Sequence, residues 1–239
     1  MKVSLTAEPE AIQFDPRQSA VVVVDMQNWD VKPGGFSDLT GGDITHAQKV
    51  IEPISHTLEA TRRSGVTVIY LKNVISKDPL LRPDEDSPWF WKASRRKFDA
   101  DPVLQRGMCI QGNWGAEIID ELAPVEGDLV IEKSLYSGFV RTDLELVLKR
   151  KGIRYLFLTG VGTPTCVDAT ARDAYFHEYW PIVLADCCNG IVPETHEQAL
   201  AAIKRRYGWV TSSDELLETL PDVSQRTPEP SQRTEGRRL

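Results

Sequence analysis

The chain has 239 residues, 41% of them hydrophobic, and this size and composition suit one generous domain with a sizeable core. The formal net charge is -7 and no long basic run is present, which disfavours a nucleic-acid partner. The opening residues carry acids and prolines where a signal peptide needs an apolar segment, and no apolar run reaches the length of a membrane span. We therefore expect a cytoplasmic protein that acts on a small molecule, with no membrane partner.

Five short apolar segments and a weaker sixth predict the strands of a buried sheet. Their nearly continuous Val, Ile, Leu and Tyr content is typical of parallel strands covered on both faces, and stretches of helical period separate them. This alternation predicts a three-layer α/β/α fold with a doubly wound, mostly parallel sheet of about six strands, whose ligands bind beyond the carboxyl ends of the strands. The expected strands are residues 20–25, 67–71, 128–132, 155–159, 181–186 and 208–210, and the expected helices are 47–63, 116–122, 142–151, 164–177 and 194–206.

Two segments do not follow this alternation of strands and helices. Residues 76–114 are too long and too polar for an ordinary connection, and such loops are usually functional or disordered. The aromatic residues Trp89, Phe90 and Trp91 within it favour an ordered lid or a subunit contact, with a plain loop core as the alternative. Residues 221–239 have almost no apolar content and predict a disordered tail, so the expected domain spans residues 1–220.

The segment after the expected strand at 155–159 has the features of a nucleophile turn. It reads GVGTPTCVDATARDA, in which Thr163 is placed to cap a helix, Pro164 suits its first position and Cys166 falls in its first turn. Free amides and the helix dipole at that end favour a thiolate, and Gly160 and Gly162 permit unusual backbone angles. The alternative is a small buried cysteine packed against the sheet.

Acidic and basic side chains follow two other expected strands. Asp25 ends the strand in VVVVDMQN, and Lys133 follows the strand in DLVIEKSLYSG. Taken alone, Asp25 is more typical of a residue that forms a turn or caps a helix, and Lys133 is more typical of a solvated surface lysine. A cysteine nucleophile, however, needs a group that takes its proton and a cation that stabilises its thiolate. The three residues at three strand ends therefore predict one catalytic constellation.

These motifs resemble the isochorismatase-like cysteine hydrolases, over almost the whole chain to about Asp214. VVVVDMQN is similar to the family's acid motif, IEKSLYSGF to its lysine motif and LTGVGTPTCVDATARDA to its cysteine motif. The resemblance implies that Asp25 is the general base, Lys133 the electrostatic partner and Cys166 the nucleophile. It also implies a cis bond between Val161 and Gly162, with the amides of Gly162 and Cys166 forming an oxyanion hole.

The resemblance also indicates the reaction and the substrate class. Family members with the cysteine hydrolyse carbon–nitrogen bonds, and many form dimers or tetramers, so we expect an amidohydrolase without a cofactor that assembles as a homo-oligomer. The opening residues, PGGFSDL and YSGF are similar to ureidoacrylate amidohydrolases, whereas TDLELVL and ADCCNG are similar to biuret hydrolases. The expected substrate is a small linear ureido compound of the ureidoacrylate, biuret or triuret type. Another small amide, such as an N-carbamoyl amino acid or a primary amide, is the alternative.

Four further residues are candidates for the pocket. Asn73 matches a polar pocket position in ureidoacrylate amidohydrolases, although an asparagine at a strand end also commonly closes a turn. Tyr136 could present its hydroxyl to substrate or pack in the core. Gln27 could bind substrate, and a role in supporting Asp25 is favoured. Arg141 could bind a substrate carboxylate, but a position on the surface is the favoured alternative.

A metal site is not expected. Some relatives bind a metal through an Asp-x-His pattern, whereas the four histidines here are scattered and none has an acid at that spacing. The four cysteines have neither zinc spacing nor the density of a disulfide scaffold, and Cys187 and Cys188 should face opposite sides of a strand. Two other classes remain open: a thiol redox protein, which would want a C-x-x-C pair, and a non-catalytic protein that keeps the fold.

Overall fold

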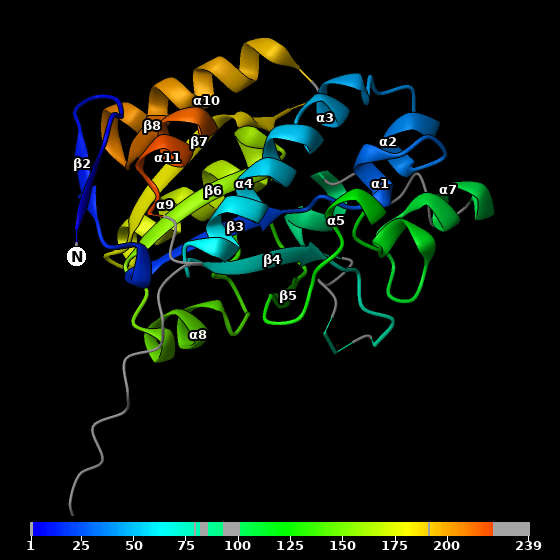
Figure 1. Cartoon of the computed structure of the whole chain (residues 1–239). Coiled ribbons are helices and arrows are strands. Elements are labelled where there is room, and N and C mark those ends of the chain that lie inside the picture. Colours follow the sequence, from blue (N-terminus) through cyan, green and yellow to red (C-terminus); the bar gives the residue numbers. More distant parts are fainter. Residues whose placement is uncertain (1, 79, 82–85, 93–100, 191, 222–239) are drawn as a thin grey trace, which may run out of the picture.

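A computed structural model describes residues 2–78, 80–81, 86–92, 101–190 and 192–221. Its centre is a sheet of six parallel strands in the order β5-β4-β3-β6-β7-β8 (Figure 1). The chain winds outward from β3 in one direction through β4 and β5, and from β6 in the other direction through β7 and β8. The doubly wound parallel sheet is thus confirmed, and its switch point lies between β3 and β6. The strands are β3 (Ser19–Val24), β4 (Thr67–Asn73), β5 (Leu129–Lys133), β6 (Tyr155–Val161), β7 (Trp180–Asn189) and β8 (Trp209–Thr211).

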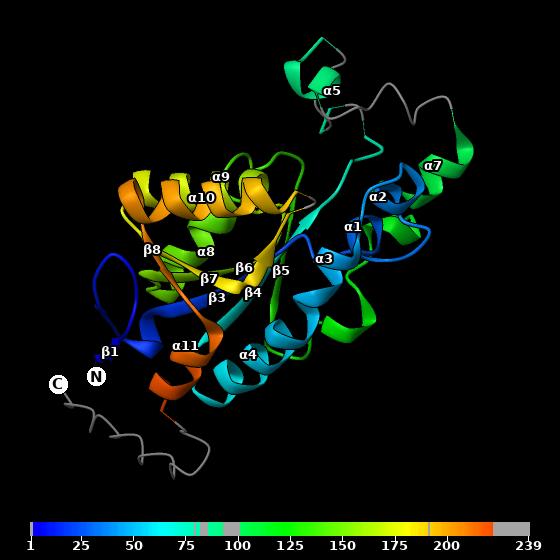
Figure 2. The same ribbon diagram turned by 90° about the horizontal axis from the view of Figure 1, so that it is seen from above.

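Helices cover both faces of this sheet, as Figure 2 shows from above. On one face, α4 (Ile51–Arg63) and α11 (Ser213–Thr219) contribute Ile54, Leu58 and Leu216 to a core that also contains Val21 and Val23 of β3. The other core contains Val22 and Val24, together with residues of α8 (Leu144–Lys151), α9 (Asp168–Phe176) and α10 (Pro193–Arg206). Alternate residues of one apolar strand therefore enter two cores, which explains why the strand has no polar face.

Two expected helices differ from the structure. The stretch 47–63 is divided into α3 (Thr45–Lys49) and α4. The stretch 116–122 is not an α-helix: it begins at the end of one short 3₁₀ turn, Trp114–Ala116, and ends with another, Asp120–Leu122. Between these turns the backbone pairs with the segment after β3: the Asn28 amide donates to the Glu117 carbonyl and the Ile119 amide to the Met26 carbonyl. This pairing occupies the Glu117 carbonyl and the Ile119 amide, which a continuous helix would use for its own hydrogen bonds.

The segment from β4 to β5 forms its own small core. Ile75, Met108, Cys109 and Ala116 are buried together, with Trp89 and other partly buried residues packed against them. Short helices surround this core, and where the chain is described Trp89 forms part of a plain loop core, the alternative that the sequence left open; 79, 82–85 and 93–100 lie outside that part. The short helices are α1 (Asn28–Val31), α2 (Phe36–Leu39), α5 (Pro88–Lys92) and α7 (Pro102–Gly107).

The amino-terminal residues add a feature that the sequence did not predict. β1 (Val3–Leu5) and β2 (Ile12–Phe14) form an antiparallel pair, and Glu8 between them bridges to Val210 of β8. Apart from Pro221, the expected tail lies outside the described residues. Within the described residues, no helix is long and apolar enough to cross a membrane.

Candidate active site

Asp25, Lys133 and Cys166 meet at the carboxyl ends of three strands. Asp25 directly follows β3, Lys133 is the last residue of β5, and Cys166 lies in the turn after β6. Because parallel strands all end at the same edge of the sheet, residues far apart in the chain come together there. The structure therefore brings together the three residues that the sequence singled out.

Lys133 is the hydrogen-bonding centre of this group. Its Nζ donates to Asp25 Oδ2 at 2.8 Å, to Cys166 Sγ at 3.4 Å and to the Leu135 carbonyl oxygen at 3.2 Å. These partners use all three donors of the ammonium group. Asp25 and Lys133 are 2% and 3% exposed, so the ion pair is shielded from bulk water and its geometry is fixed. Asp25 Oδ1 is also buried and has no hydrogen-bond partner.

Burial and charge leave Cys166 protonated at rest. Burial raises the pKa of the Cys166 thiol well above its ordinary value, the negative charge of Asp25 adds to that rise, and Lys133 opposes it. Burial alone would lower the pKa of Lys133, but the negative charge of Asp25, together with the hydrogen bonds that Lys133 donates to Asp25 and Cys166, outweighs burial and raises it. The resting group is therefore a neutral thiol beside a carboxylate and an ammonium ion. The free thiolate expected from the helix dipole is not the favoured state, because the dipole is weaker than burial and the adjacent carboxylate.

Asp25 has an unusual backbone conformation. Its φ is 53°, in the left-handed region that non-glycine residues seldom occupy, and its amide donates to the Leu71 carbonyl at 3.0 Å. The Gln27 amide then donates back to the Asp25 carbonyl at 2.8 Å. This tight turn stops β3 and aims the carboxylate across the end of the sheet, and such strain is typical of functional sites.

The turn that carries Cys166 depends on two glycines. Gly160 has φ 110°, and a Cβ there would lie 2.0 Å from the Val24 carbonyl oxygen of the neighbouring strand. Gly162 has φ 76° and precedes a π-helical turn, η4 (Thr163–Val167), which leads into α9. The expected start of the helix is thus wrong in detail: Gly162 occupies the cap position, and Thr163 Oγ1 instead lies 2.9 Å from His196 Nδ1 of α10.

The expected cis bond between Val161 and Gly162 is also wrong, because Glu8–Pro9 is the cis bond found among the described residues. The Gly162 amide donates to the Asn189 carbonyl at 2.8 Å, extending the β6–β7 pairing by one residue. With that amide occupied, the oxyanion hole expected from Gly162 and Cys166 is not assembled as a pair in this structure. The positive φ angles of Gly160 and Gly162 supply the sharp turn instead.

Gln27 and Asn73 lie next to each other but differ in their exposure to the cavity. The Gln27 side chain accepts from the Asn73 amide at 2.7 Å and donates to the carbonyls of Asn73 and Ala116 at 2.9 and 2.7 Å. Gln27 is fully buried and does not line the cavity, so the expected contact with substrate is not found there. Its side chain joins the segment after β3 to the end of β4 and to Ala116, and its link to Asp25 is the backbone hydrogen bond from the Gln27 amide and not a bond to the carboxylate. Asn73 lines the cavity, and its Oδ1 is buried without a hydrogen-bond partner.

The remaining candidates are divided between the cavity and the surface. Tyr136 lines the cavity and is 43% exposed, so it does not pack in the core. Arg141 lies on the surface among residues that flank β5 and α8, outside this cavity. Trp89 packs into the small core of the loop, and Trp91 is 54% exposed. Neither of these tryptophans lines the cavity.

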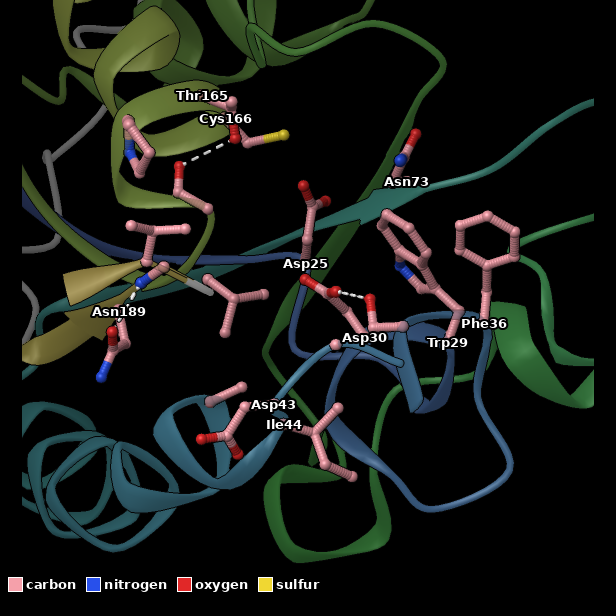
Figure 3. Close-up of a pocket in the computed structure, with 18 of the residues that line it drawn as sticks. Asp25, Trp29, Asp30, Phe36, Asp43, Ile44, Asn73, Thr165, Cys166 and Asn189 are labelled. Carbon is pink, nitrogen blue, oxygen red and sulfur yellow. Dashed lines mark hydrogen bonds between the residues drawn. The ribbon is translucent and has the colours of Figure 1, made fainter. Parts of the chain in front are cut away.

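Figure 3 shows the side chains that line the cavity beside Asp25 and Cys166. The volume of this cavity is about 350 Å³. Asp25 and Cys166 form one side, and the other side comes from the short helices that follow β3. The sequence gives no signal for this second side, because helices of four residues have no measurable period. The side chains it contributes include those of Trp29, Asp30, Phe36 and Asp43.

Other titratable groups form no second constellation in the part of the chain that is described. There, no three His, Cys, Asp or Glu side chains are arranged to hold a metal ion. Cys187 belongs to one core and Cys188 to the other, as their alternation predicted. Cys109 is 1% exposed, and burial raises the pKa of its thiol to about 12, which makes it unreactive.

Comparisons with known proteins agree with this architecture. A protein-family model described as the isochorismatase domain matches residues 19–215. The chain is 39% identical to the ureidoacrylate amidohydrolase RutB of Caulobacter segnis over 227 residues, which cover 94% of this chain and 95% of that relative. A solved cysteine hydrolase from Pseudomonas syringae pv. phaseolicola 1448A superposes with a TM-score of 0.71 at 26% identity, covering 86% and 93% of the two chains. The solved N-carbamoylsarcosine amidase of Thermoplasma acidophilum superposes with a TM-score of 0.61 at 30% identity, covering 82% of this chain and 97% of that one.

Proposed function

Because this chain belongs to the isochorismatase family, we propose that it is a cysteine-dependent amidohydrolase that cleaves a carbon–nitrogen bond of a small linear ureido compound. The observation that carries the proposal is the arrangement of Cys166 Sγ and Asp25 Oδ2 around one ammonium group, 3.4 and 2.8 Å from Lys133 Nζ. The adjoining cavity of about 350 Å³ is of the size that small ligands occupy. Ureidoacrylate hydrolysis by the relative supports the same bond type and substrate class.

In the proposed first step, Asp25 removes the thiol proton while Cys166 Sγ attacks the carbonyl carbon. Asp25 Oδ1 is the available acceptor, since Oδ2 already accepts from Lys133. Proton transfer during the attack suits a thiol whose pKa is raised by burial, because no free thiolate has to accumulate beforehand. The negative charge then lies on the former carbonyl oxygen, where the Cys166 amide within the turn η4 is the proposed donor.

The second step breaks the carbon–nitrogen bond. The oxyanion re-forms the carbonyl, the nitrogen leaves with the proton held by Asp25, and an acyl or carbamoyl group remains on Sγ. Water then attacks this thioester carbon, Asp25 takes its proton, and the thiol is regenerated when that proton returns to sulfur. Throughout, Lys133 keeps Asp25 Oδ2 in place and offsets the charge that develops on sulfur.

The proposal is tested by incubating the purified protein with ureidoacrylate, biuret, an N-carbamoyl amino acid and a simple primary amide. Loss of each compound is followed by chromatography for the parent protein and for Cys166→Ala. We expect turnover of a ureido compound, a covalent adduct on Cys166 in mass spectra, and a fall in rate of about 10⁴-fold or more in the variant. Turnover that survives in Cys166→Ala would contradict a cysteine nucleophile, and consumption of the primary amide alone would contradict the ureido class.

Three features stay predictions and belong to this proposal. The domain is proposed to span residues 1–220, and the family model supports most of that range. Assembly as a homo-oligomer, a dimer or a tetramer, is proposed from the family resemblance alone. A cytoplasmic location is proposed from the composition of the chain.

A further inference from the structure

The charged side chains that line the catalytic cavity, within the described part of the chain, are all carboxylates: Asp25, Asp30 and Asp43. The nearest cation, Lys133, does not line the cavity, and its three donors are taken by Asp25, Cys166 and the Leu135 carbonyl. A substrate carboxylate would thus meet negative charge on several sides. The three carboxylates are suited to bind a group that donates hydrogen bonds and carries no negative charge.

Asp30 is the carboxylate that the mechanism does not use. It lies on α1 beside the cavity, and its Oδ1 accepts a hydrogen bond from Ser37 Oγ of α2 (Figure 3). Burial raises the pKa of Asp30 to about 6, the hydrogen bond from Ser37 lowers it, and the charge of Asp25 raises it further. Asp30 is therefore mainly ionised at pH 7. Asp43, in contrast, has a side chain that is 57% exposed and lies 3.6 Å from His46, where water screens its charge.

Most of the unsatisfied polar groups on the residues that line the cavity around Asp30 are hydrogen-bond acceptors. Trp29 and Phe36 also line the cavity, and aromatic faces favour flat or cationic nitrogen groups. Three buried polar atoms on residues of this cavity lack a hydrogen-bond partner: Asp25 Oδ1, Asn73 Oδ1 and Trp29 Nε1. Two of the three are acceptors. Buried acceptors without donors are costly, and a ligand rich in N–H groups would satisfy them.

We propose that Asp30 is a specificity-determining residue that receives the N–H-bearing end of the substrate, a neutral carbamoyl or amino group, and disfavours a substrate that ends in a carboxylate. The inference rests on the proposed function and narrows it to ureido compounds with a neutral, nitrogen-rich far end. It also separates this chain from its relative, whose name denotes an anionic substrate, ureidoacrylate.

The test compares two ligands that differ only at the far end: ureidoacrylate, which carries a carboxylate, and ureidoacrylamide, which carries a carboxamide. Binding is measured by titration calorimetry at pH 7.5 in a Cys166→Ser background, so that neither compound is consumed. We expect the protein that keeps Asp30 to bind the carboxamide at least about tenfold more tightly than the carboxylate, because a partly buried like charge disfavours the anion. Asp30→Asn, which keeps the shape and the acceptor for Ser37, should bring the two affinities within about threefold.

Glu52→Gln, an exposed change on α4 that removes one negative charge outside the cavity, is the matched control and should leave the ratio unchanged. Asp30→Ser, which also removes the charge, provides a second variant if Asp30→Asn does not fold. Equal binding of both compounds to the Asp30 protein, or a ratio that the Asp30 variants do not change, overturns the inference and leaves the amidohydrolase standing. If neither compound binds, the inference is overturned, and the turnover assay with biuret then decides separately whether the ureido class stands.

Discussion

The two sides of the catalytic cavity are built in different ways. The side that carries Asp25, Lys133 and Cys166 is made of strand ends, and its polar groups are held by the hydrogen bonds of a buried ammonium ion. The opposite side is made of α1 and α2, two helices of four residues, and carries Asp30 and aromatic side chains. A rigid sheet edge suits groups whose relative positions decide the chemistry. The residues of the short helices, in contrast, can be substituted without disturbing the sheet. This division agrees with the proposal that one side carries out catalysis and the other selects the substrate.

The largest expected effect on stability comes from breaking the ion pair on the strand-end side. Lys133→Met leaves Asp25 buried without a cation, and removing one partner of a buried pair costs about 3–5 kcal/mol. The free energy of unfolding from chemical denaturation measures this cost. Adding Asp25→Asn to Lys133→Met removes the uncompensated charge and should recover most of the loss. If the double variant loses as much free energy of unfolding as Lys133→Met and Asp25→Asn lose in sum, the two residues are not energetically coupled.

A second prediction tests how closely the strands are packed under the triad. Gly160→Ala places a Cβ against the Val24 carbonyl oxygen at a position with φ 110°, so both overpacking and backbone strain apply. We expect a loss of about 2–4 kcal/mol in the free energy of unfolding. Gly65→Ala is the matched control, because its φ is 73° and nothing lies within 4 Å of its Cβ.

The control should lose only the strain of the left-handed conformation, about 1 kcal/mol. Equal losses in the two variants would mean that contact with Val24 contributes nothing, and the strand-end side would then be less rigid than we argue. A large fall in activity for Gly160→Ala with little loss of stability would indicate that the turn shifts Cys166 rather than unfolding the sheet.

The same division explains how much the sequence could predict. Buried parallel strands have continuous apolar runs, so the six strands and the residues at their ends, Asp25, Lys133 and Cys166, follow from the pattern. Trp29 and Asp30 give no such signal, since four-residue helices have no period. The occupied amide of Gly162 depends on where the Asn189 carbonyl lies, which is a property of strand pairing across the sheet and not of the local motif.

The smallest of these effects concerns the helical side and depends on pH. The pKa of Asp30 is about 6 in the folded protein, above that of an unfolded aspartate at about 3.9, so the folded protein binds the proton more tightly. The stabilisation from this proton is fully present below about pH 4 and is lost as pH rises through 6. Asp30→Asn removes the ionisation, so its advantage over the parent should grow from near zero at pH 4 to about 1–3 kcal/mol at pH 7.5, with partial solvent access reducing the value.

Denaturation of both proteins at intervals from pH 4 to pH 8 measures this difference, and titrations shared by the two proteins cancel in the comparison. Asp25, whose charge raises the pKa of Asp30, and Ser37, which donates to its carboxylate, are unchanged in the variant. If the difference in free energy of unfolding between the two proteins stays constant across this pH range, burial does not raise the pKa of Asp30. Its carboxylate would then be well solvated, and its charge would be too screened to distinguish a substrate that ends in a carboxylate from one that ends in an amide.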